Sequence, residues 1–393
     1  MNLFSKKKKP YTPAVFPFVS KKGKQTVTVQ RPFDVYLFFT TLLLVLIGIM
    51  MIFSASAILA KENFGDTYYF LKKQLVFFCI GFVILFMCKE FSYKRYEKLI
   101  YPMLAATFCL MIVSFIPGIS HSAKGATRWI SVAGFTVQPS ELAKIVVVIF
   151  TAYLISKKGE RIREFTKGFL PVIGISGLFI LLILAQKDLG SAFVLASVVF
   201  ILLFVSGTHI KYLLTMILAS APMLYFLIFS VSFRKRRILA FLDPWKYQLD
   251  YGFQIIQSFV AFKSGGLTGV GLGESKQKLF YLPEAHTDFI FSVIGEEFGL
   301  VGVVVVISLF LFFVWQGLKI ALKTKDPFGM YLALGLTALI GLEAFINFGV
   351  VMGVLPTKGL ALPFISYGGT SLITSLMAVG ILLNISTHTG EEV

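Results

Sequence analysis

Residues 282–315 read Leu-Pro-Glu-Ala-His-Thr-Asp-Phe-Ile-Phe-Ser-Val-Ile-Gly-Glu-Glu-Phe-Gly-Leu-Val-Gly-Val-Val-Val-Val-Ile-Ser-Leu-Phe-Leu-Phe-Phe-Val-Trp, in which carboxylates lead into a long apolar run and then lie within it. An apolar run of about 18 residues or more predicts a membrane-spanning helix. An ionisable side chain inside such a helix costs roughly 2.5–3.5 kcal/mol on insertion scales, so we expect it to have a use or a partner. Asp288, Glu296 and Glu297 therefore mark the part of the chain in which we expect chemistry.

The composition of the whole chain is that of a membrane protein. Its 393 residues are 56% hydrophobic and 15% charged, and the mean hydropathy is +0.82. Long apolar runs recur, which predicts an all-α polytopic integral membrane protein with ten transmembrane helices. The predicted segments are residues 34–57, 74–88, 99–117, 139–156, 169–185, 191–207, 212–231, 289–316, 329–350 and 369–387.

The formal net charge of +17 is distributed in a way that predicts membrane topology rather than nucleic-acid binding. If the helices alternate from an inside N-terminus, most Lys and Arg residues fall on the inner side, as the positive-inside rule requires. Both termini are therefore expected in the cytoplasm, with a large extracytoplasmic loop between helices 7 and 8. The predicted divisions are a basic cytoplasmic tail at 1–32, helices 1–7 within 33–231, the loop with an interfacial helix at 232–288, helices 8–10 within 289–388 and a second tail at 389–393.

The large loop combines a basic cluster with a helical segment and a glycine-rich segment. Arg234-Lys-Arg-Arg237 either contacts solvent and lipid headgroups or binds an anionic substrate group such as a diphosphate. Residues 251–262 have helical spacing, which predicts an interfacial helix. Residues 265–273 lack the strand–turn–helix context of a P-loop, and this favours a flexible or tightly turned re-entrant loop.

Further polar side chains lie within the predicted helices or at their ends. Glu141 and Lys144 are three residues apart, so they form either a structural ion pair or a cavity-lining pair that also holds substrate. Glu343 and Asn347 are four residues apart and admit the same two interpretations. The outer helix ends carry two more charges, Arg128 and Asp188. The three cysteines lie in apolar segments and the four histidines are scattered, so neither disulfides nor a metal site are predicted.

Asp288 and Glu296 are expected to differ because they lie at different depths. Asp288 is at the membrane boundary, where water and lipid headgroups both reach, and it is either a helix cap or a reactive group. Glu296 comes eight residues later, roughly 12 Å deeper at 1.5 Å per residue, which predicts a buried and partnered carboxylate. Gly295 and Gly299 form a small-xxx-small pair suited to close helix contact.

Seven motifs together give the chain a specific resemblance. They are Gly125-Ala-Thr-Arg-Trp-Ile130, Gln138-Pro-Ser-Glu-Leu-Ala-Lys144, Gln186-Lys-Asp-Leu-Gly190, Leu282-Pro-Glu-Ala-His-Thr-Asp-Phe-Ile-Phe291, Gly295-Glu-Glu297, Leu355-Pro-Thr-Lys-Gly359 and Pro363-Phe-Ile-Ser-Tyr-Gly-Gly-Thr370. Over nearly the whole membrane region the chain resembles the SEDS family (shape, elongation, division and sporulation; FtsW/RodA/SpoVE), most closely its cell-division branch, FtsW. One departure is Lys187, where the family commonly has proline.

The resemblance implies a peptidoglycan glycosyltransferase that polymerises lipid II at the outer face of the bacterial cytoplasmic membrane, at the division septum. Asp288 matches the family's catalytic carboxylate and would act as general base. The implied partners are lipid II and undecaprenyl diphosphate, membrane lipids, a class B penicillin-binding protein and other divisome membrane proteins. No cofactor is expected, except that a divalent cation, Mg or Mn, is an alternative to arginine for neutralising the diphosphate. The candidate substrate-binding residues are Arg128, Glu141, Lys144, Asp188, Arg234, Arg236, Arg237, His286, Glu296, Lys358 and Ser366.

Two other functions compete with glycosyl transfer. A lipid II flippase would also use intramembrane charges, but it needs them across both leaflets, whereas here they concentrate toward the outer half. A scaffold that recruits the penicillin-binding protein without catalysis predicts that Asp288→Asn leaves function intact.

Overall fold

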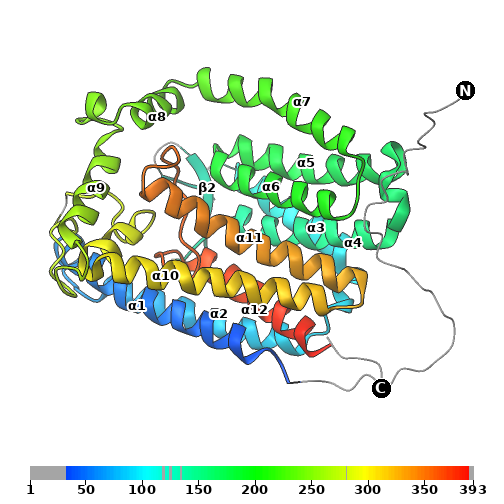
Figure 1. The fold of residues 1–393 in the computed structure, drawn as a ribbon, viewed down its shortest axis with the longest axis horizontal. Coiled ribbons are helices and arrows are strands. Elements are labelled where there is room, and N and C mark those ends of the chain that lie inside the picture. Colours follow the sequence, from blue (N-terminus) through cyan, green and yellow to red (C-terminus); the bar gives the residue numbers. More distant parts are fainter. Residues whose placement is uncertain (1–31, 117–119, 124–125, 133–134, 280, 389–393) are drawn as a thin grey trace, which may run out of the picture.

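The structure is a computed structural model that describes residues 32–116, 120–123, 126–132, 135–279 and 281–388. Among these residues the helical bundle contains ten apolar helices (Figure 1), and each overlaps a predicted segment, with ends that differ by up to seven residues. Nine of them are long and apolar enough to cross a membrane, and the tenth, α6, has 17 residues. The ten are α1 (Val35–Phe64), α2 (Tyr69–Glu90), α3 (Lys94–Val113), α4 (Pro139–Lys158), α5 (Leu170–Ala185), α6 (Leu189–Val205), α7 (Ile210–Phe229), α10 (Ile290–Lys323), α11 (Pro327–Val351) and α12 (Gly369–Thr387).

Local sequence signals set several of the helix ends. The Asp34 carboxylate accepts a hydrogen bond from the Leu37 amide at 2.9 Å and caps α1, and Asp326 caps α11 through the Gly329 amide in the same way. Pro139 opens α4, where its missing N–H would have had no helical partner. Gly65 ends α1 in the left-handed conformation, with φ +71°.

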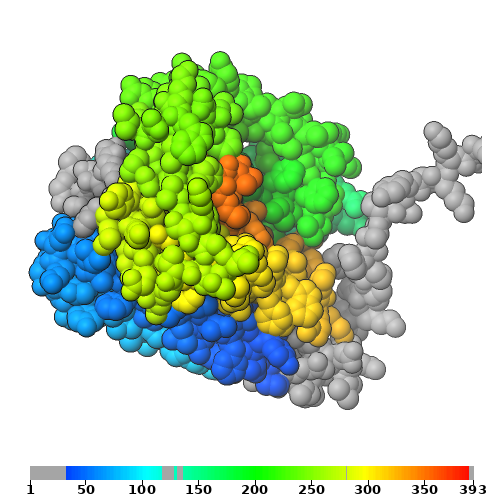
Figure 2. All heavy atoms as spheres, turned by 60° about the vertical axis from the view of Figure 1, so that its left-hand side comes forward, coloured from blue at the N-terminus to red at the C-terminus, as the bar shows by residue number. Residues whose placement is uncertain are grey.

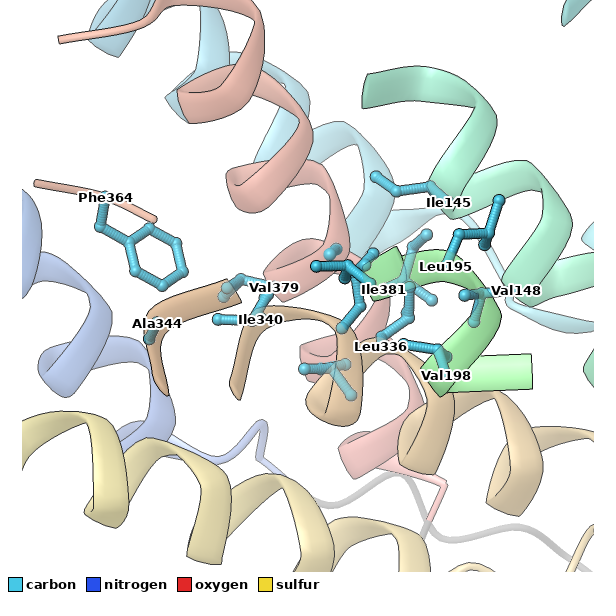
Figure 3. Close-up of a cluster of buried hydrophobic side chains, with 14 of the residues drawn as sticks. Ile145, Val148, Leu195, Val198, Leu336, Ile340, Ala344, Phe364, Val379 and Ile381 are labelled. Atoms are coloured by element: carbon cyan, nitrogen blue, oxygen red, sulfur yellow. The ribbon is translucent and has the colours of Figure 1, made fainter. Parts of the chain in front are cut away.

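The centre of the bundle is formed by α4 and α11, against which α6 and α12 pack. From Pro139 to Ile155 every residue of α4 except Leu142 is buried. Figure 3 shows how the facing side chains meet in one apolar cluster, with Ile145 and Val148 from α4, Leu195 and Val198 from α6, Leu336 and Ile340 from α11, and Val379 and Ile381 from α12. Burial all round α4 identifies it as a core helix rather than a lipid-facing one.

A small antiparallel sheet joins α3 to α4 and was not predicted from the sequence. Its strands are β1 (Ser120–Ala123), β2 (Ala126–Val132) and β3 (Phe135–Val137), in the order β1-β2-β3. Ile130 pairs with Ser120 on one side and with Val137 on the other. The sheet carries Arg128 and delivers the chain to the first turn of α4.

The large loop between α7 and α10 contains two α-helices, α8 (Ser232–Leu242) and α9 (Phe253–Gly265), and the short 3-10 helix η3 (Trp245–Tyr247). The predicted helix at 251–262 is confirmed as α9, which packs against α10. Figure 1 shows α7 and α8 arching over one side of the bundle, and in α7 only Leu213 is buried. Figure 2 shows the orange segment that follows α11 reaching the surface beside the yellow-green column of α8 and α9.

Helix α10 is broken at Gly299, although the sequence predicts an uninterrupted helix over 289–316. Gly299 has φ +62°, a conformation that suits glycine. The glycine-rich segment of the loop pairs with the opened backbone: the Val270 amide donates to the Glu296 carbonyl at 3.0 Å, and the Leu300 amide donates to the Gly266 carbonyl at 2.9 Å. Of the two alternatives predicted for 265–273, the structure shows the tightly turned loop, which satisfies backbone groups that the break would leave without partners.

Candidate functional site

Asp288 lies at the entrance to α10, in a segment whose backbone is held at three consecutive carbonyl groups. The His286 carbonyl accepts from the Tyr367 amide at 3.0 Å, and the Thr287 carbonyl accepts from the Ser366 hydroxyl at 2.6 Å. The Asp288 carbonyl accepts from the Asn347 side-chain amide at 2.9 Å. Helix α11 and the segment before α12 therefore fix the backbone of this half-buried aspartate. A simple helix cap would not require these contacts.

The segment after α11 also approaches the Asp288 side chain. Asn347 donates a second hydrogen bond, at 2.7 Å, to the Leu360 carbonyl and so joins the two segments. A Cβ atom placed on Gly359 would lie 3.0 Å from Asp288 Oδ2. Because that separation is tighter than ordinary van der Waals contact, glycine is the residue that fits beside the carboxylate.

Arg128 and Asp188 form a second part of the same region. Their closest charged atoms are 3.9 Å apart, and Arg128 also donates to the carbonyls of Gln186 and Lys187. Asp188 is buried and caps α6, where it accepts from the Ser191 amide at 3.1 Å and from the Ser191 hydroxyl at 2.9 Å. The carboxylate is thereby occupied in holding the helix end and the strand-borne arginine together.

Charges in this region act on the basic cluster of α8. Burial lowers the pKa of the Arg237 guanidinium from its usual value; the charge of Arg128 also lowers it, whereas Tyr251 and Asp288 raise it. Burial and the charge of Arg128 likewise lower the pKa of Arg234, whose guanidinium donates to the Leu227 carbonyl at 2.9 Å. Arg237 is thus close enough to Arg128 and to Asp288 for both charges to act on it.

Three other candidate residues contact neighbouring side chains: Arg236, Lys358 and His286. Arg236 is exposed and lies 4.0 Å from the Asp250 carboxylate. Lys358 lies over the Phe193 ring, 4.5 Å from its centroid; burial lowers the pKa of Lys358, and Asp188 raises it. The His286 ring lies 4.8 Å from the Phe70 ring, and burial lowers its pKa, opposed by Glu284.

Deeper in the bundle, one lysine joins two carboxylates from different helices. Lys144 donates to Glu141 at 2.8 Å within α4 and also pairs with Glu343 of α11. All three side chains are buried. The predicted Glu141–Lys144 pair therefore forms, and Glu343 pairs with this lysine. A buried ion network of this kind braces the two central helices and is strongly sensitive to loss of one member.

Glu296 and Glu297 anchor the large loop at the break in α10. Glu296 accepts from the Ser275 hydroxyl and from the Lys276 amide at 3.1 Å, so its oxygens are occupied by the protein itself. Glu297 accepts from the Ser54 hydroxyl of α1 at 2.6 Å and from Lys278 at 3.1 Å. Both carboxylates are buried and partnered, as expected for Glu296 from its depth.

The roles of three residues in this arrangement were not predicted from the sequence. Asn347 was noted only for its spacing from Glu343, whereas its amide holds the Asp288 and Leu360 backbones. Lys278 and Ser54 carried no signal of their own, since a lysine in a loop and a serine in an apolar helix are both common. Only the position of Glu297 inside an apolar run indicated that a partner had to approach from elsewhere in the chain.

The arrangement combines a positioned carboxylate with several partly buried cations at one end of the bundle. A carboxylate can accept a proton from a nucleophilic hydroxyl, and arginines can hold a phosphate group through paired hydrogen bonds. Among the described residues, no group of three or more His, Cys, Asp or Glu side chains is arranged to hold a metal ion.

Comparisons with known proteins agree with this geometry. The family model described as "Cell cycle protein" (FtsW/RodA/SpoVE) matches residues 34–391. The chain is 48% identical over 356 residues to "Probable peptidoglycan glycosyltransferase FtsW" of Geobacter metallireducens, which spans 91% of this chain and 95% of the relative. It is 40% identical over 355 residues to "Stage V sporulation protein E" of Bacillus subtilis, covering 90% of this chain and 97% of that protein.

Solved structures give the same result for the fold. A chain from a study of a peptidoglycan synthase complex that coordinates polymerization and crosslinking superposes with a TM-score of 0.73 at 28% identity, over 90% of this chain and 97% of that one. The rod shape determining protein RodA of Thermus thermophilus superposes with a TM-score of 0.64 at 25% identity, over 90% of this chain and 96% of RodA. On the match over residues 34–391 and the identity to these relatives, the chain belongs to the FtsW/RodA/SpoVE family of multi-pass membrane proteins.

Proposed function

We propose that this peptidoglycan glycosyltransferase polymerises lipid II at the outer face of the cytoplasmic membrane during cell division, with Asp288 as general base. A sugar hydroxyl is a poor nucleophile, so a carboxylate within hydrogen-bond reach takes its proton as the new bond forms. The 4-hydroxyl of GlcNAc attacks the anomeric carbon of MurNAc, the bond to the diphosphate breaks, and undecaprenyl diphosphate leaves. Direct in-line displacement converts the α-linkage of the donor into a β-linkage.

The observation that carries this proposal is the fixed backbone of Asp288. Its own carbonyl and those of the two preceding residues accept hydrogen bonds from Asn347, Ser366 and the Tyr367 amide. Proton transfer and displacement both depend on placement, since a misplacement of about 1 Å reduces rates by about 100-fold. In this proposal Ser366 and His286 act through the backbone that positions Asp288.

The leaving diphosphate is assigned to the cations around Asp288. Arg128, Arg234, Arg237 and Lys358 are partly or largely buried, and burial lowers the pKa of the last three. Positioned positive charge at a leaving diphosphate stabilises the transition state. A divalent cation remains an alternative; it would take most of its ligands from diphosphate oxygens and water, as magnesium often does.

The remaining candidates are assigned supporting roles. Glu141, Lys144 and Glu343 hold α4 against α11, and Glu296 holds the large loop against α10. Arg236, which is exposed, contributes to the positive field that attracts the diphosphate rather than to a fixed contact.

A class B penicillin-binding protein is the proposed partner, supplying crosslinks to the strands made here. Support comes from the similarity to a chain of a peptidoglycan synthase complex that coordinates polymerization with crosslinking. We also propose that both termini lie in the cytoplasm and that the active protein lies at the division septum; the charge distribution supports the first and the similarity to FtsW relatives supports the second.

The experiment that tests the function compares two reactions of the same purified protein. Labelled lipid II is supplied with the partner present, and glycan strands are separated by gel electrophoresis; the protein is also placed in vesicles and tested for movement of lipid II between leaflets. Strand formation without accelerated movement is the expected result. Accelerated movement without strands would replace the transferase by a flippase.

A further inference from the structure

Two turns meet at the end of the bundle opposite Asp288. One turn joins α4 to α5 and contains η1 (Gly159–Arg163) and η2 (Phe165–Phe169), and the other joins α6 to α7. The Tyr212 ring at the start of α7 lies 5.3 Å from the Phe165 ring and 5.3 Å from the Phe169 ring. This aromatic contact fixes the two turns against each other.

Exposed cations without carboxylate partners lie on the first turn and at the start of α7. A Cβ atom placed on Gly207, in the second turn, would lie 3.5 Å from Arg163 Nη2, so the guanidinium of the first turn reaches across to the second. Lys211 lies 5.0 Å from the centroid of the Tyr212 ring. Within the described part of the chain Arg161, Arg163 and Lys211 form no ion pair, whereas Lys167 is 3.4 Å from Glu164.

Apolar side chains are exposed on the same turns. Phe165 is 46% exposed and Ile210 is 63% exposed, although Phe165 also contacts Tyr212. At the end of a membrane helix, exposed apolar side chains enter the boundary between acyl chains and headgroups, and neighbouring cations lie at the depth of the lipid phosphates. The exposed apolar side chains can therefore contact the acyl chains of a phospholipid, and the cations can contact its phosphate.

We propose that this basic corner, formed by Arg161, Arg163, Phe165, Lys211 and Tyr212, binds the headgroup of an anionic phospholipid. The unpaired cations provide the charge complementarity, and each cation that reaches the same headgroup is expected to strengthen binding about fivefold. The rings of Phe165 and Tyr212 hold the cations of the two turns together. A lipid bound here also supports the base of α7, a helix in which only Leu213 is buried.

The test measures lipid binding by the full-length purified protein after delipidation in detergent. Phosphatidylglycerol and phosphatidylcholine with identical acyl chains are titrated, and bound lipid is counted by native mass spectrometry. The corner variant combines three substitutions, Arg161→Gln, Arg163→Gln and Lys211→Gln. It is expected to bind phosphatidylglycerol roughly 100-fold more weakly than the wild type, with little change for phosphatidylcholine.

A matched control removes the same charge near the C-terminal end of α10. It combines Lys319→Gln, Lys323→Gln and Lys325→Gln, three cations that are also without ion pairs among the described residues. The control is expected to retain most of the phosphatidylglycerol preference of the wild type, because its three cations lie along a single stretch of chain and are not gathered from two turns at one headgroup. Equal losses in the two variants, or no preference in the wild type, would overturn the proposal.

A milder variant keeps the test usable if the triple corner variant does not fold. Lys211→Gln alone is expected to reduce phosphatidylglycerol binding about fivefold, because one cation is lost while the aromatic contact remains. Unchanged binding of this variant, with an unchanged melting temperature, would likewise overturn the proposal.

Discussion

Asn347 offers the sharpest test of how the site is built. Its side-chain amide donates to the carbonyls of Asp288 at 2.9 Å and Leu360 at 2.7 Å. Asn347→Ala leaves both carbonyls without this donor, at about 1–3 kcal/mol for each buried group. We expect a loss of stability of roughly 2–6 kcal/mol from the two groups together, and a displaced Asp288 backbone. A displacement of about 1 Å lowers the rate about 100-fold.

Asn384 of α12 is the matched control for this substitution. It is also buried, donates to the Lys89 carbonyl at 2.6 Å and accepts from the Tyr93 amide at 2.8 Å, at the opposite end of the bundle. Asn384→Ala is therefore expected to lose similar stability without moving Asp288.

The assay measures the initial rate of lipid II polymerisation, with the partner present, per folded molecule, and the melting temperature of each variant. Asn347→Ala should lower kcat by 10- to 100-fold with a small change in KM, because the substrate contacts remain while the base is displaced. If the two asparagine variants lose activity equally per folded molecule, Asn347 does not position Asp288 and the reasoning is refuted.

Three further predictions concern the backbone and the buried charges. Gly359→Ala should lower kcat about tenfold or more with little loss of stability, since the added methyl group crowds Asp288; Gly174→Ala, which meets no atom within 4 Å, is the control. Lys144→Met should destabilise the protein by about 3–5 kcal/mol in chemical denaturation, because two buried carboxylates lose their cation, and an unchanged midpoint would contradict this. Lys187→Pro should lower stability by about 3 kcal/mol. Lys187 has φ +62°, whereas proline is restricted to φ near −65° and lacks the backbone N–H donor. A melting temperature at or above that of the wild type would contradict this expectation.

The ten membrane helices could be predicted because hydropathy is a local property. Each apolar run has to satisfy its backbone within itself, so composition and length identify a helix without knowledge of its neighbours. The sheet at 120–137 was missed because its short strands carry no comparable apolar run. The break at Gly299 was missed because hydrogen bonds from residues 266–271 stabilise it, and one helix sequence does not encode such a contact.

The candidate site was predictable as a set of residues but not as a network. Spacing alone paired Glu141 with Lys144, since helical neighbours three residues apart share a face. The same spacing rule grouped Glu343 with Asn347, yet Glu343 pairs with Lys144 and Asn347 binds the Asp288 backbone. Both contacts join elements far apart in sequence, and folding of the whole chain is needed to bring them together.

The role of Asp288 as general base is the central claim, and one substitution tests it most directly. Asp288→Asn preserves the shape of the side chain and the backbone hydrogen bonds but removes the proton acceptor. With the partner present, the polymerisation rate of labelled lipid II should fall by roughly 100- to 10,000-fold, while lipid II binding and the melting temperature stay close to those of the wild type. Strand synthesis at an undiminished rate by a folded Asp288→Asn protein would contradict the account.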